Sequence, residues 1–318
     1  MNVGVSLPTV GPIGEREFVL DIARAADRAG LHSVWGTDHV VFPKERKTPY
    51  PYQRSTTEVL SSPGVDWLDP VATMGVVAGA TERVQIGTAV LVLPYRNPVV
   101  LANELATLDR LSEGRIILGI GAGWMDEEFE AVGVRPAERG ARTDEYIKVL
   151  KTLWSSKGYT SFEGRFVSLH DVTLAAKPHR PGGPPIFVGG NSGPALRRAG
   201  ALADGWLGME IFVEEIADAR TALHKAAADA GRDPASIAMA VRRGVVPPFE
   251  VSNLLPERTT LGGSAQQVAG ELLRYRDEGV SIVVLDLAMF PAEAVATIEW
   301  LAAEVLPLLG GRPARPST

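Results

Sequence analysis

The strongest constraint on the fold of this chain is an alternation of short β-rich runs and longer helical patterns, which continues over almost all of its 318 residues. In the first helical segment, Phe18, Ile22, Ala25 and Ala29 recur at helical spacing. Eight strands are predicted, at residues 3–7, 33–36, 84–91, 115–120, 185–188, 205–207, 237–242 and 282–287. Helices are predicted to follow them at residues 16–29, from 69 onward, and at 99–111, 138–154, 194–203, 213–230, 264–278 and 292–309.

Eight strand–helix repeats indicate an α/β protein with a closed parallel (β/α)8, or TIM, barrel, and the alternative is a doubly wound open sheet. A dinucleotide-binding open sheet usually carries a glycine fingerprint after its first strand, and residues 8–12 lack it. We therefore predict one barrel domain over residues 1–318. Three insertions, at about residues 41–68, 155–184 and 244–262, are expected to wall the C-terminal mouth, where barrels carry their active sites. Within the second insertion, residues 160–167 are expected to form a hairpin.

The composition excludes several classes of protein. There is no cysteine, so disulfides, thiolate metal sites and cysteine nucleophiles are impossible, and the histidine spacings of zinc sites are absent too, so no metal site is expected. A net charge of −6 argues against nucleic-acid binding. No signal-peptide pattern and no apolar run of about 20 residues occur, so a soluble cytoplasmic protein with no membrane partner is expected. Any redox chemistry must then depend on a bound organic cofactor.

The first candidate functional residues follow the second predicted strand. Asp38 and His39 stand side by side there, where they could transfer a proton or hydrogen-bond a polar ring. The alternative is a structural histidine beside an aspartate that caps a turn.

A second candidate site follows the fifth predicted strand. Gly189, Gly190, Asn191 and Ser192 precede a helix, and this pattern favours a phosphate cradle, because backbone N–H groups and the helix N-terminus attract an anion. The alternative is an ordinary turn in which Ser192 or Asn191 caps the helix. The glycines of residues 119–123 lack the full dinucleotide pattern and are expected to let a flat ligand approach the backbone.

Several motifs of the chain occur together in one known superfamily. They are WGTDH at 35–39, YRNP at 95–98, ATLDRLSEGR at 106–115, GIGAGW at 119–124, VGGNS at 188–192 and DGW at 204–206. On these motifs the chain resembles the bacterial-luciferase-like superfamily over about residues 1–310. Within it, the chain is most similar to the actinobacterial branch that uses the deazaflavin coenzyme F420.

The resemblance implies a (β/α)8 barrel that forms a homodimer and holds a flavin or deazaflavin across its mouth. The phosphate of the cofactor would sit in the turn after the fifth strand, His39 would be a proton donor or orienting group near the reactive ring, and Asp38 would contact a polar edge of that ring. A non-proline cis peptide would lie behind the ring, placed here at Ala89–Val90. The residues expected to contact the cofactor are Asp38, Thr88, Ala89, Val90, Gly121, Gly189, Gly190, Asn191 and Ser192.

One position departs from the pattern of the relatives that oxidise sugar phosphates. They carry a glutamate acid/base just after the glycines of the fourth strand, where this chain has Trp124. Glucose-6-phosphate is therefore not the expected substrate. Trp124, Trp206 and Met209 together suggest a hydrophobic substrate pocket, although each could instead belong to the core.

Three functions remain open from the sequence. The first is hydride transfer between F420 and a small, rather apolar organic substrate; the second is an FMN-dependent monooxygenase; the third is a non-catalytic flavin-binding barrel. The anionic oligoglutamate tail of F420 would require cations near the mouth. The candidates for this role are Arg46, Lys47 and Arg54 in the first insertion, or Lys177 and Arg180 in the second.

Overall fold

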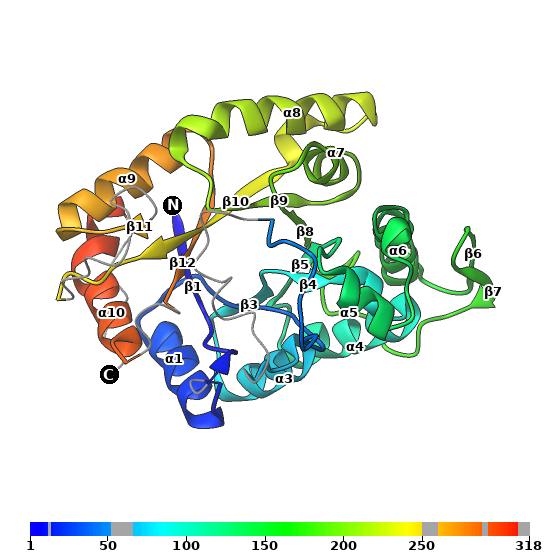
Figure 1. Ribbon diagram of the computed structural model, residues 1–318, viewed down its shortest axis with the longest axis horizontal. Coiled ribbons are helices and arrows are strands. Elements are labelled where there is room, and N and C mark those ends of the chain that lie inside the picture. Colours follow the sequence, from blue (N-terminus) through cyan, green and yellow to red (C-terminus); the bar gives the residue numbers. More distant parts are fainter. Residues whose placement is uncertain (12–13, 52–65, 250–259, 288–291, 311–318) are drawn as a thin grey trace.

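The computed structural model describes residues 1–11, 14–51, 66–249, 260–287 and 292–310 of the chain (Figure 1). Its centre is a ring of parallel strands in the order β12, β1, β2, β3, β5, β8, β9, β10, and β10 pairs again with β12 to close the ring. These strands are β1 (Asn2–Ser6), β2 (Ser33–Gly36), β3 (Gln85–Thr88), β5 (Ile116–Gly121), β8 (Ile186–Gly189), β9 (Gly205–Met209), β10 (Ala238–Val245) and β12 (Ile282–Asp286). The predicted (β/α)8 barrel is confirmed.

Helices surround this ring on its outside, as Figure 1 shows. They are α1 (Arg16–Arg28), α3 (Pro70–Ala80), α4 (Pro98–Leu111), α6 (Arg139–Ser155), α7 (Gly193–Leu202), α8 (Ile216–Asp229), α9 (Ala265–Asp277) and α10 (Ala294–Trp300). The predicted last helix is divided, because α10 continues as a π-helix over Leu301–Val305 and a 3-10 helix over Leu306–Leu309. A short helix after β5, α5 (Asp126–Ala131), was not predicted.

The sequence specifies several helix starts locally. Asn97 and Asp69 cap α4 and α3 through their side chains, and each is followed by a proline at the first helical position. Ser264 and Gln267 form a capping box at the start of α9.

Trp35 fills the inside of the barrel. Its side chain is fully buried with Ile117, Phe187 and Leu207, in an apolar cluster separate from the larger core between strands and helices. Glycine at 87 leaves room for the indole, because a Cβ there would lie 2.5 Å from an indole carbon. The inside of the barrel is therefore a packed core rather than a channel.

The third predicted strand, 84–91, is interrupted. The ladder of β3 ends at Thr88, the Ala89–Val90 peptide is cis, and pairing with β5 resumes in β4 (Leu91–Val92). The predicted cis peptide is thus confirmed. Its backbone is held on both sides, since the Ala89 N–H donates to Gly36 O at 2.7 Å and an Arg242 guanidinium N–H donates to Ala89 O at 3.2 Å.

The insertions occupy two ends of the barrel. The hairpin of the second is confirmed as β6 (Thr160–Glu163) and β7 (Ser168–Val172). This insertion, however, joins the C-terminal end of α6 to the start of β8, and none of its described residues lines the cavity at the mouth. The expectation that it walls the mouth is therefore wrong. Part of the first insertion does line the mouth, and the third contributes β11 (Thr260–Leu261), which pairs with the end of β10.

Candidate active site

A cavity of about 1070 Å³ opens at the C-terminal ends of the strands. Side chains that follow β2, β3, β5, β8 and β9 line it, together with Arg242 of β10 and part of the first insertion. Most of the predicted site residues line this cavity, namely Asp38, His39, Ala89, Val90, Gly121, Trp124, Gly189, Gly190, Asn191, Ser192 and Met209. Thr88 and Trp206 do not.

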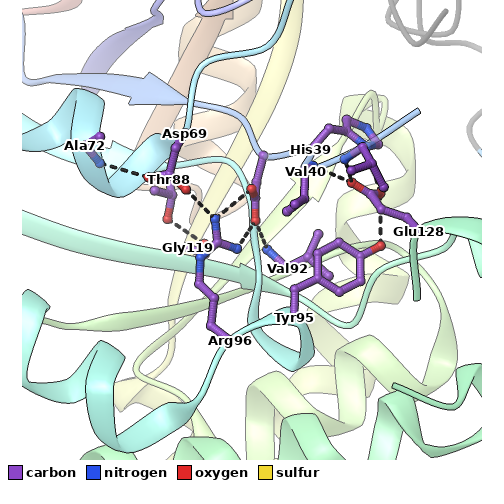
Figure 2. Close-up of polar contacts among 12 residues, drawn as sticks. His39, Val40, Asp69, Ala72, Thr88, Val92, Tyr95, Arg96, Gly119 and Glu128 are labelled. Carbon is purple, nitrogen blue, oxygen red and sulfur yellow. Dashed lines mark hydrogen bonds and ion pairs between the residues drawn. The ribbon is translucent and has the colours of Figure 1, made fainter. Parts of the chain in front are cut away.

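His39 is held by a glutamate that the sequence analysis did not identify. Its Nδ1 lies 3.0 Å from Oε2 of Glu128, and the same oxygen accepts a hydrogen bond from the Tyr95 hydroxyl at 3.0 Å (Figure 2). The other oxygen, Oε1, accepts the backbone N–H groups of Val40 at 2.5 Å and Val41 at 3.3 Å. Since a carboxylate only accepts hydrogen bonds, Nδ1 of His39 carries a hydrogen, and Nε2 remains for the cavity.

Glu128 is suited to remain ionised in this position. Its side chain is only 1% exposed, and burial alone would raise its pKa. The hydrogen bond and the charge of His39, followed by the Val40 N–H and the Tyr95 hydroxyl, instead hold the pKa of Glu128 below its usual value. Burial and this carboxylate raise the pKa of Tyr95, so the phenol stays a hydrogen-bond donor.

Asp38 has a different role from the one expected. Both of its carboxylate oxygens bind Arg96, at 2.5 and 2.9 Å, and one also accepts the Val92 N–H at 2.8 Å. Figure 2 shows Arg96 reaching on to Asp69, the cap of α3. The Asp38 carboxylate therefore fastens the segment after the cis peptide, and both of its oxygens already accept donors of the protein, although the residue also lines the cavity.

Val90 projects between two strand-end glycines. A Cβ on Gly121 would lie 2.6 Å from one Val90 methyl carbon, and a Cβ on Gly189 would lie 2.4 Å from the other. A Cβ on Gly119 would meet the carbonyl oxygen of Thr88 at 1.9 Å. A Cβ on Gly123 would likewise lie 2.7 Å from a Val92 methyl carbon, so the expectation that the glycines of 119–123 admit a flat ligand is corrected for all three, because this chain's own atoms fill the space beside them. Thr88 itself is buried and donates from Oγ1 to Gly119 O at 2.6 Å.

The turn after β8 is tied firmly to β9. The Asn191 side chain binds both the carbonyl and the N–H of Met209, at 2.6 and 3.0 Å, and the Gly190 N–H donates to Leu207 O at 3.1 Å. Trp206 faces the helical layer, where its indole N–H donates to Gly190 O at 2.8 Å. Its predicted place in the substrate pocket is therefore wrong, since the alternation of side chains along β9 turns Leu207 inward instead.

Two arginines beside this turn also line the cavity. Ser192 caps α7 through a 3.4 Å bond from the Ala195 N–H, as the alternative interpretation expected. Because Pro194 has no N–H and the Leu196 N–H donates to Ser192 O, the Gly193 N–H is, among the described residues, the one backbone donor that this first helical turn leaves over. Arg139 at the start of α6 and Arg198 in α7 line the same cavity, where their guanidinium groups form ion pairs with Asp126 and Asp144. The turn thus combines a helix N-terminus with two cations, an arrangement that attracts anions.

Two of the cations predicted to bind the anionic tail of the cofactor, Arg180 and Lys177, lie away from the cavity. Arg180 binds Asp109 and the carbonyl of Ile116, the first residue of β5, and Lys177 binds Ser156 O beyond the end of α6. Both lie at the opposite end of the barrel from the cavity, so their proposed role is wrong.

The first insertion supplies the other candidate cations. Arg46 lies at the mouth, Lys47 belongs to the segment whose backbone binds Glu127 of α5, and Arg54 lies outside the described residues.

Aromatic rings surround His39 at the mouth. The rings of Phe42, Trp67 and Trp124 have their centroids 5.0, 4.6 and 6.1 Å from the imidazole, and Tyr50 packs edge-on against Trp124 at 5.2 Å. We call these five residues the aromatic box. Within this box, the indole N–H of Trp67 is buried and has no acceptor among the described residues.

A buried charged cluster forms the opposite wall of the cavity. Glu210 follows β9 in a left-handed conformation, with φ at 47°, and its side chain lines the cavity. Burial, together with the charge of Asp286, raises the pKa of Glu210 to about 7. The sequence analysis did not identify this carboxylate, because the predicted strand ends at residue 207 and Glu210 directly follows only the longer observed strand β9.

The fold and site together define a (β/α)8-barrel protein whose mouth combines a histidine–carboxylate pair, an anion-attracting turn and a non-proline cis peptide. A sequence model of the family described as luciferase-like monooxygenase matches residues 1–247, and the chain belongs to this family.

Curated relatives and solved structures extend this comparison. The chain is 37% identical over 205 residues to the F420-dependent glucose-6-phosphate dehydrogenase of Kineococcus radiotolerans, a match of 62% of this chain and 55% of that protein. It matches less than two thirds of the length of the curated relatives to which it is most similar.

Two solved structures share the fold. One is an F420-dependent secondary alcohol dehydrogenase in complex with an F420–acetone adduct, with a TM-score of 0.78, 20% identity and coverage of 97% of this chain and 98% of that one. The other is the oxygenating constituent of 3,6-diketocamphane monooxygenase of Pseudomonas putida in complex with FMN, with a TM-score of 0.75, 18% identity and coverage of 96% and 98%.

The described residues contain neither a membrane-spanning helix nor a metal-binding cluster. No helix among them is both long and apolar enough to cross a membrane. Within the same ranges, no group of three or more histidine, aspartate or glutamate side chains is arranged to hold a metal ion.

Proposed function

We propose that this protein is an oxidoreductase that binds coenzyme F420 in the cavity and transfers a hydride between it and a small, apolar organic substrate. The observation that carries the proposal is the pair of His39 and Glu128 at the cavity mouth, with Nε2 of the histidine left for a ligand. F420, when bound, supplies or accepts the hydride.

The role of His39 follows from the contacts of Glu128. The carboxylate stabilises the imidazolium through a charge-assisted hydrogen bond at Nδ1, and it leaves Nε2 as the ring nitrogen that can exchange a proton with a ligand in the cavity that His39 lines. In the reductive direction, Nε2 donates its proton to the substrate oxygen or nitrogen that becomes negative as the hydride arrives at carbon. In the oxidative direction, the neutral imidazole accepts that proton at the same atom.

The anionic portion of the cofactor fits the turn after β8. The rim there offers the N-terminus of α7 and the guanidinium groups of Arg139 and Arg198, which also form ion pairs with Asp126 and Asp144, and Arg139 is 42% exposed. Arg197, also exposed, lies one turn into the same helix. These cations suit the phosphate that F420 and FMN share, and their extension to exposed positions favours the longer anionic tail of F420.

The aromatic box supports the apolar substrate. Its rings surround the imidazole that would exchange a proton with the substrate, so a substrate that reaches Nε2 must pack against aromatic faces. The one polar group that the box adds is the buried Trp67 indole N–H, which could donate a hydrogen bond to a substrate carbonyl. Small ketones, aldehydes, imines or the corresponding alcohols, with flat or apolar substituents, fit these walls.

Cofactor titration tests the proposal. Purified protein would be mixed with F420 and, separately, with FMN, and binding and turnover would be followed anaerobically and in air. We expect F420 to bind and to be oxidised or reduced independently of oxygen. Tight FMN binding with oxygen-dependent product and no F420 binding would instead establish the luciferase-type monooxygenase, and binding of neither would favour a non-catalytic barrel.

A histidine variant tests the site. His39→Gln should lower turnover by about 10²-fold or more while cofactor binding is retained. The matched control is His170→Gln, because His170 is 76% exposed on the β6–β7 hairpin. Equal rates for the two variants would remove His39 from the mechanism.

The family resemblance also leads us to propose a cytoplasmic homodimer. Light scattering of the purified full chain measures its mass directly, and a monomer at micromolar concentration would refute the dimer.

A further inference from the structure

Glu210 and His39 lie on opposite walls of the cavity. In the closed ring of strands, β9, which precedes Glu210, is four strands away from β2, which precedes His39. The backbone fixes Glu210 firmly, because its N–H donates to Arg242 O at 3.0 Å. Its side chain is only 11% exposed, although it lines the cavity.

The groups around Glu210 are unusually rich in charge for a buried site. Arg242 binds Asp286 through one terminal nitrogen and Ala89 O through the other, and Asp286 also accepts the Ser6 hydroxyl at 2.9 Å. Arg243 Nε lies 3.7 Å from Glu210 Oε2. Two guanidinium groups and two carboxylates therefore share one buried region.

The protonation state of Glu210 decides the net charge of this region. Burial and the nearby Asp286 disfavour its ionised form more strongly than Arg243 and Arg242 favour it, so the pKa of Glu210 rises to about 7. When Glu210 is protonated, the four groups carry one net positive charge; when it is ionised, their charges cancel.

Other titratable groups also lie near Glu210, and they bear on the net charge of this region. Tyr275 of α9 has its pKa raised by burial, so the phenol stays neutral near pH 7. Other titratable side chains near the cluster, among the described residues, are Tyr50 of the first insertion, whose charge acts on Arg242, Glu271 of α9, whose charge acts on Tyr275, and Glu215, which lines the cavity and accepts the Phe212 N–H.

One of the three guanidinium nitrogens of Arg242 lacks an acceptor among the described residues. Its Nε–H is buried, and the described residues give it no acceptor, although the side chain lines the cavity. A buried guanidinium N–H without a partner is costly, so an acceptor from the molecule in the cavity would be stabilising.

We propose that Glu210 and Arg242 form a second ligand-binding centre, which receives a negatively charged oxygen or nitrogen of the molecule in the cavity and takes up a proton at Glu210 as that group binds. The proton comes from solvent and converts the Glu210 carboxylate to a carboxylic acid, and no bond of the ligand breaks. In the setting of the proposed function, this ligand is the redox-active ring of the cofactor.

Proton uptake during binding tests this centre. F420 binding would be measured by titration calorimetry in buffers of different ionisation enthalpy, for the wild type, Glu210→Gln and the control Glu215→Gln. At pH 7 the wild type and the control should take up about half a proton more than Glu210→Gln. The ratio of the wild-type Kd to the Glu210→Gln Kd should rise about tenfold between pH 6 and 8, because titrations of the ligand cancel in this ratio. A ratio that does not change with pH would overturn the proposal.

A measurement without cofactor separates this proposal from the proposed function. If F420 does not bind the wild type, the function fails, and the centre can still be tested by carbon NMR of the glutamate carboxyls, assigned with Glu210→Gln. A Glu210 midpoint near pH 7 that rises when formate is added would support the centre. A midpoint below about pH 5, or one that formate does not move, would overturn it.

Discussion

Replacing Glu128 with glutamine tests the central element of the site. The carboxylate accepts at both oxygens: Oε1 binds the backbone N–H groups of Val40 and Val41, and Oε2 binds His39 Nδ1 and the Tyr95 hydroxyl. An amide has one accepting end and one donating end, so it can satisfy only one of these pairs. The backbone donors cannot change, and the amide NH₂ must therefore face His39.

The expected loss follows from these contacts. The imidazolium loses a charge-assisted hydrogen bond, worth about 1.5–3 kcal/mol, and its Nδ1–H is placed against another donor, which costs about 1–3 kcal/mol more. Taking about 3–4 kcal/mol for the sum, the step that uses protonated His39 should slow by about 10²–10³-fold. The neutral imidazole would also reverse its tautomer, so that Nε2 carries the hydrogen at neutral pH.

The adjacent residue provides the control. Glu127→Gln makes the same change of charge in the same first turn of α5, where Glu127 binds Lys47 and Thr48 rather than His39. The assay is F420 turnover, measured by its absorbance from pH 5 to 9, with nitrogen NMR of the His39 ring to assign the tautomer. If Glu128→Gln is no slower than Glu127→Gln, or if its His39 tautomer is unchanged, the role given to this carboxylate is wrong.

Acid stability provides a second readout of Glu128. Its pKa is lowered in the folded state, so it stabilises the fold fully above its unfolded pKa, and this contribution is lost as the pH falls through the folded pKa. The stability of Glu128→Gln should therefore depend less on pH in the acidic range, which urea unfolding at pH 3 to 7 would measure. An unchanged pH dependence would contradict the assigned cause.

Three further changes test the surrounding structure. Gly189→Ala places a methyl group against Val90 and should cost about 1–3 kcal/mol of stability, whereas the double variant with Val90→Ala should recover most of it; failure to recover would contradict the packing. Asn191→Ala removes both side-chain bonds to β9 and should lower the free energy of unfolding by about 1–3 kcal/mol and weaken cofactor binding, so an unchanged Kd would show that the turn is held otherwise. Asp38→Asn breaks a buried ion pair and should destabilise the fold by about 3–5 kcal/mol, and a loss of cofactor affinity without a loss of stability would restore the ligand-binding role.

Much of the fold could be predicted from local patterns in the sequence. The strands and helices follow from short-range periodicity, and their number determines a closed barrel with its cavity at the C-terminal ends. The location of His39 at the mouth was predicted from its place after the second strand, and the cis peptide was predicted through the family resemblance. The failures for Thr88 and Trp206 are also local, because they depend on which way a strand side chain points at the end of the ladder.

The hydrogen-bond partners of the site residues could not be predicted from local patterns. His39 and Glu128 are 89 positions apart, and they meet because the segments after β2 and β5 converge on the same mouth. Asp38 stands beside His39 in sequence, yet its carboxylate turns to Arg96, which is 58 positions away. A hydrogen bond depends on a few tenths of an ångström and on direction, and no local pattern specifies either across such separations.

The sequence by itself therefore determined the barrel, the mouth and the family, because these depend on periodicity and on motifs within short segments. Only the tertiary structure decided the chemistry of the walls. It placed a carboxylate behind His39 and left Glu210 with Arg242, Arg243 and Asp286 in one buried region. The protonation of a buried group depends on the sum of desolvation and surrounding charge, and that sum exists only once distant segments are packed together.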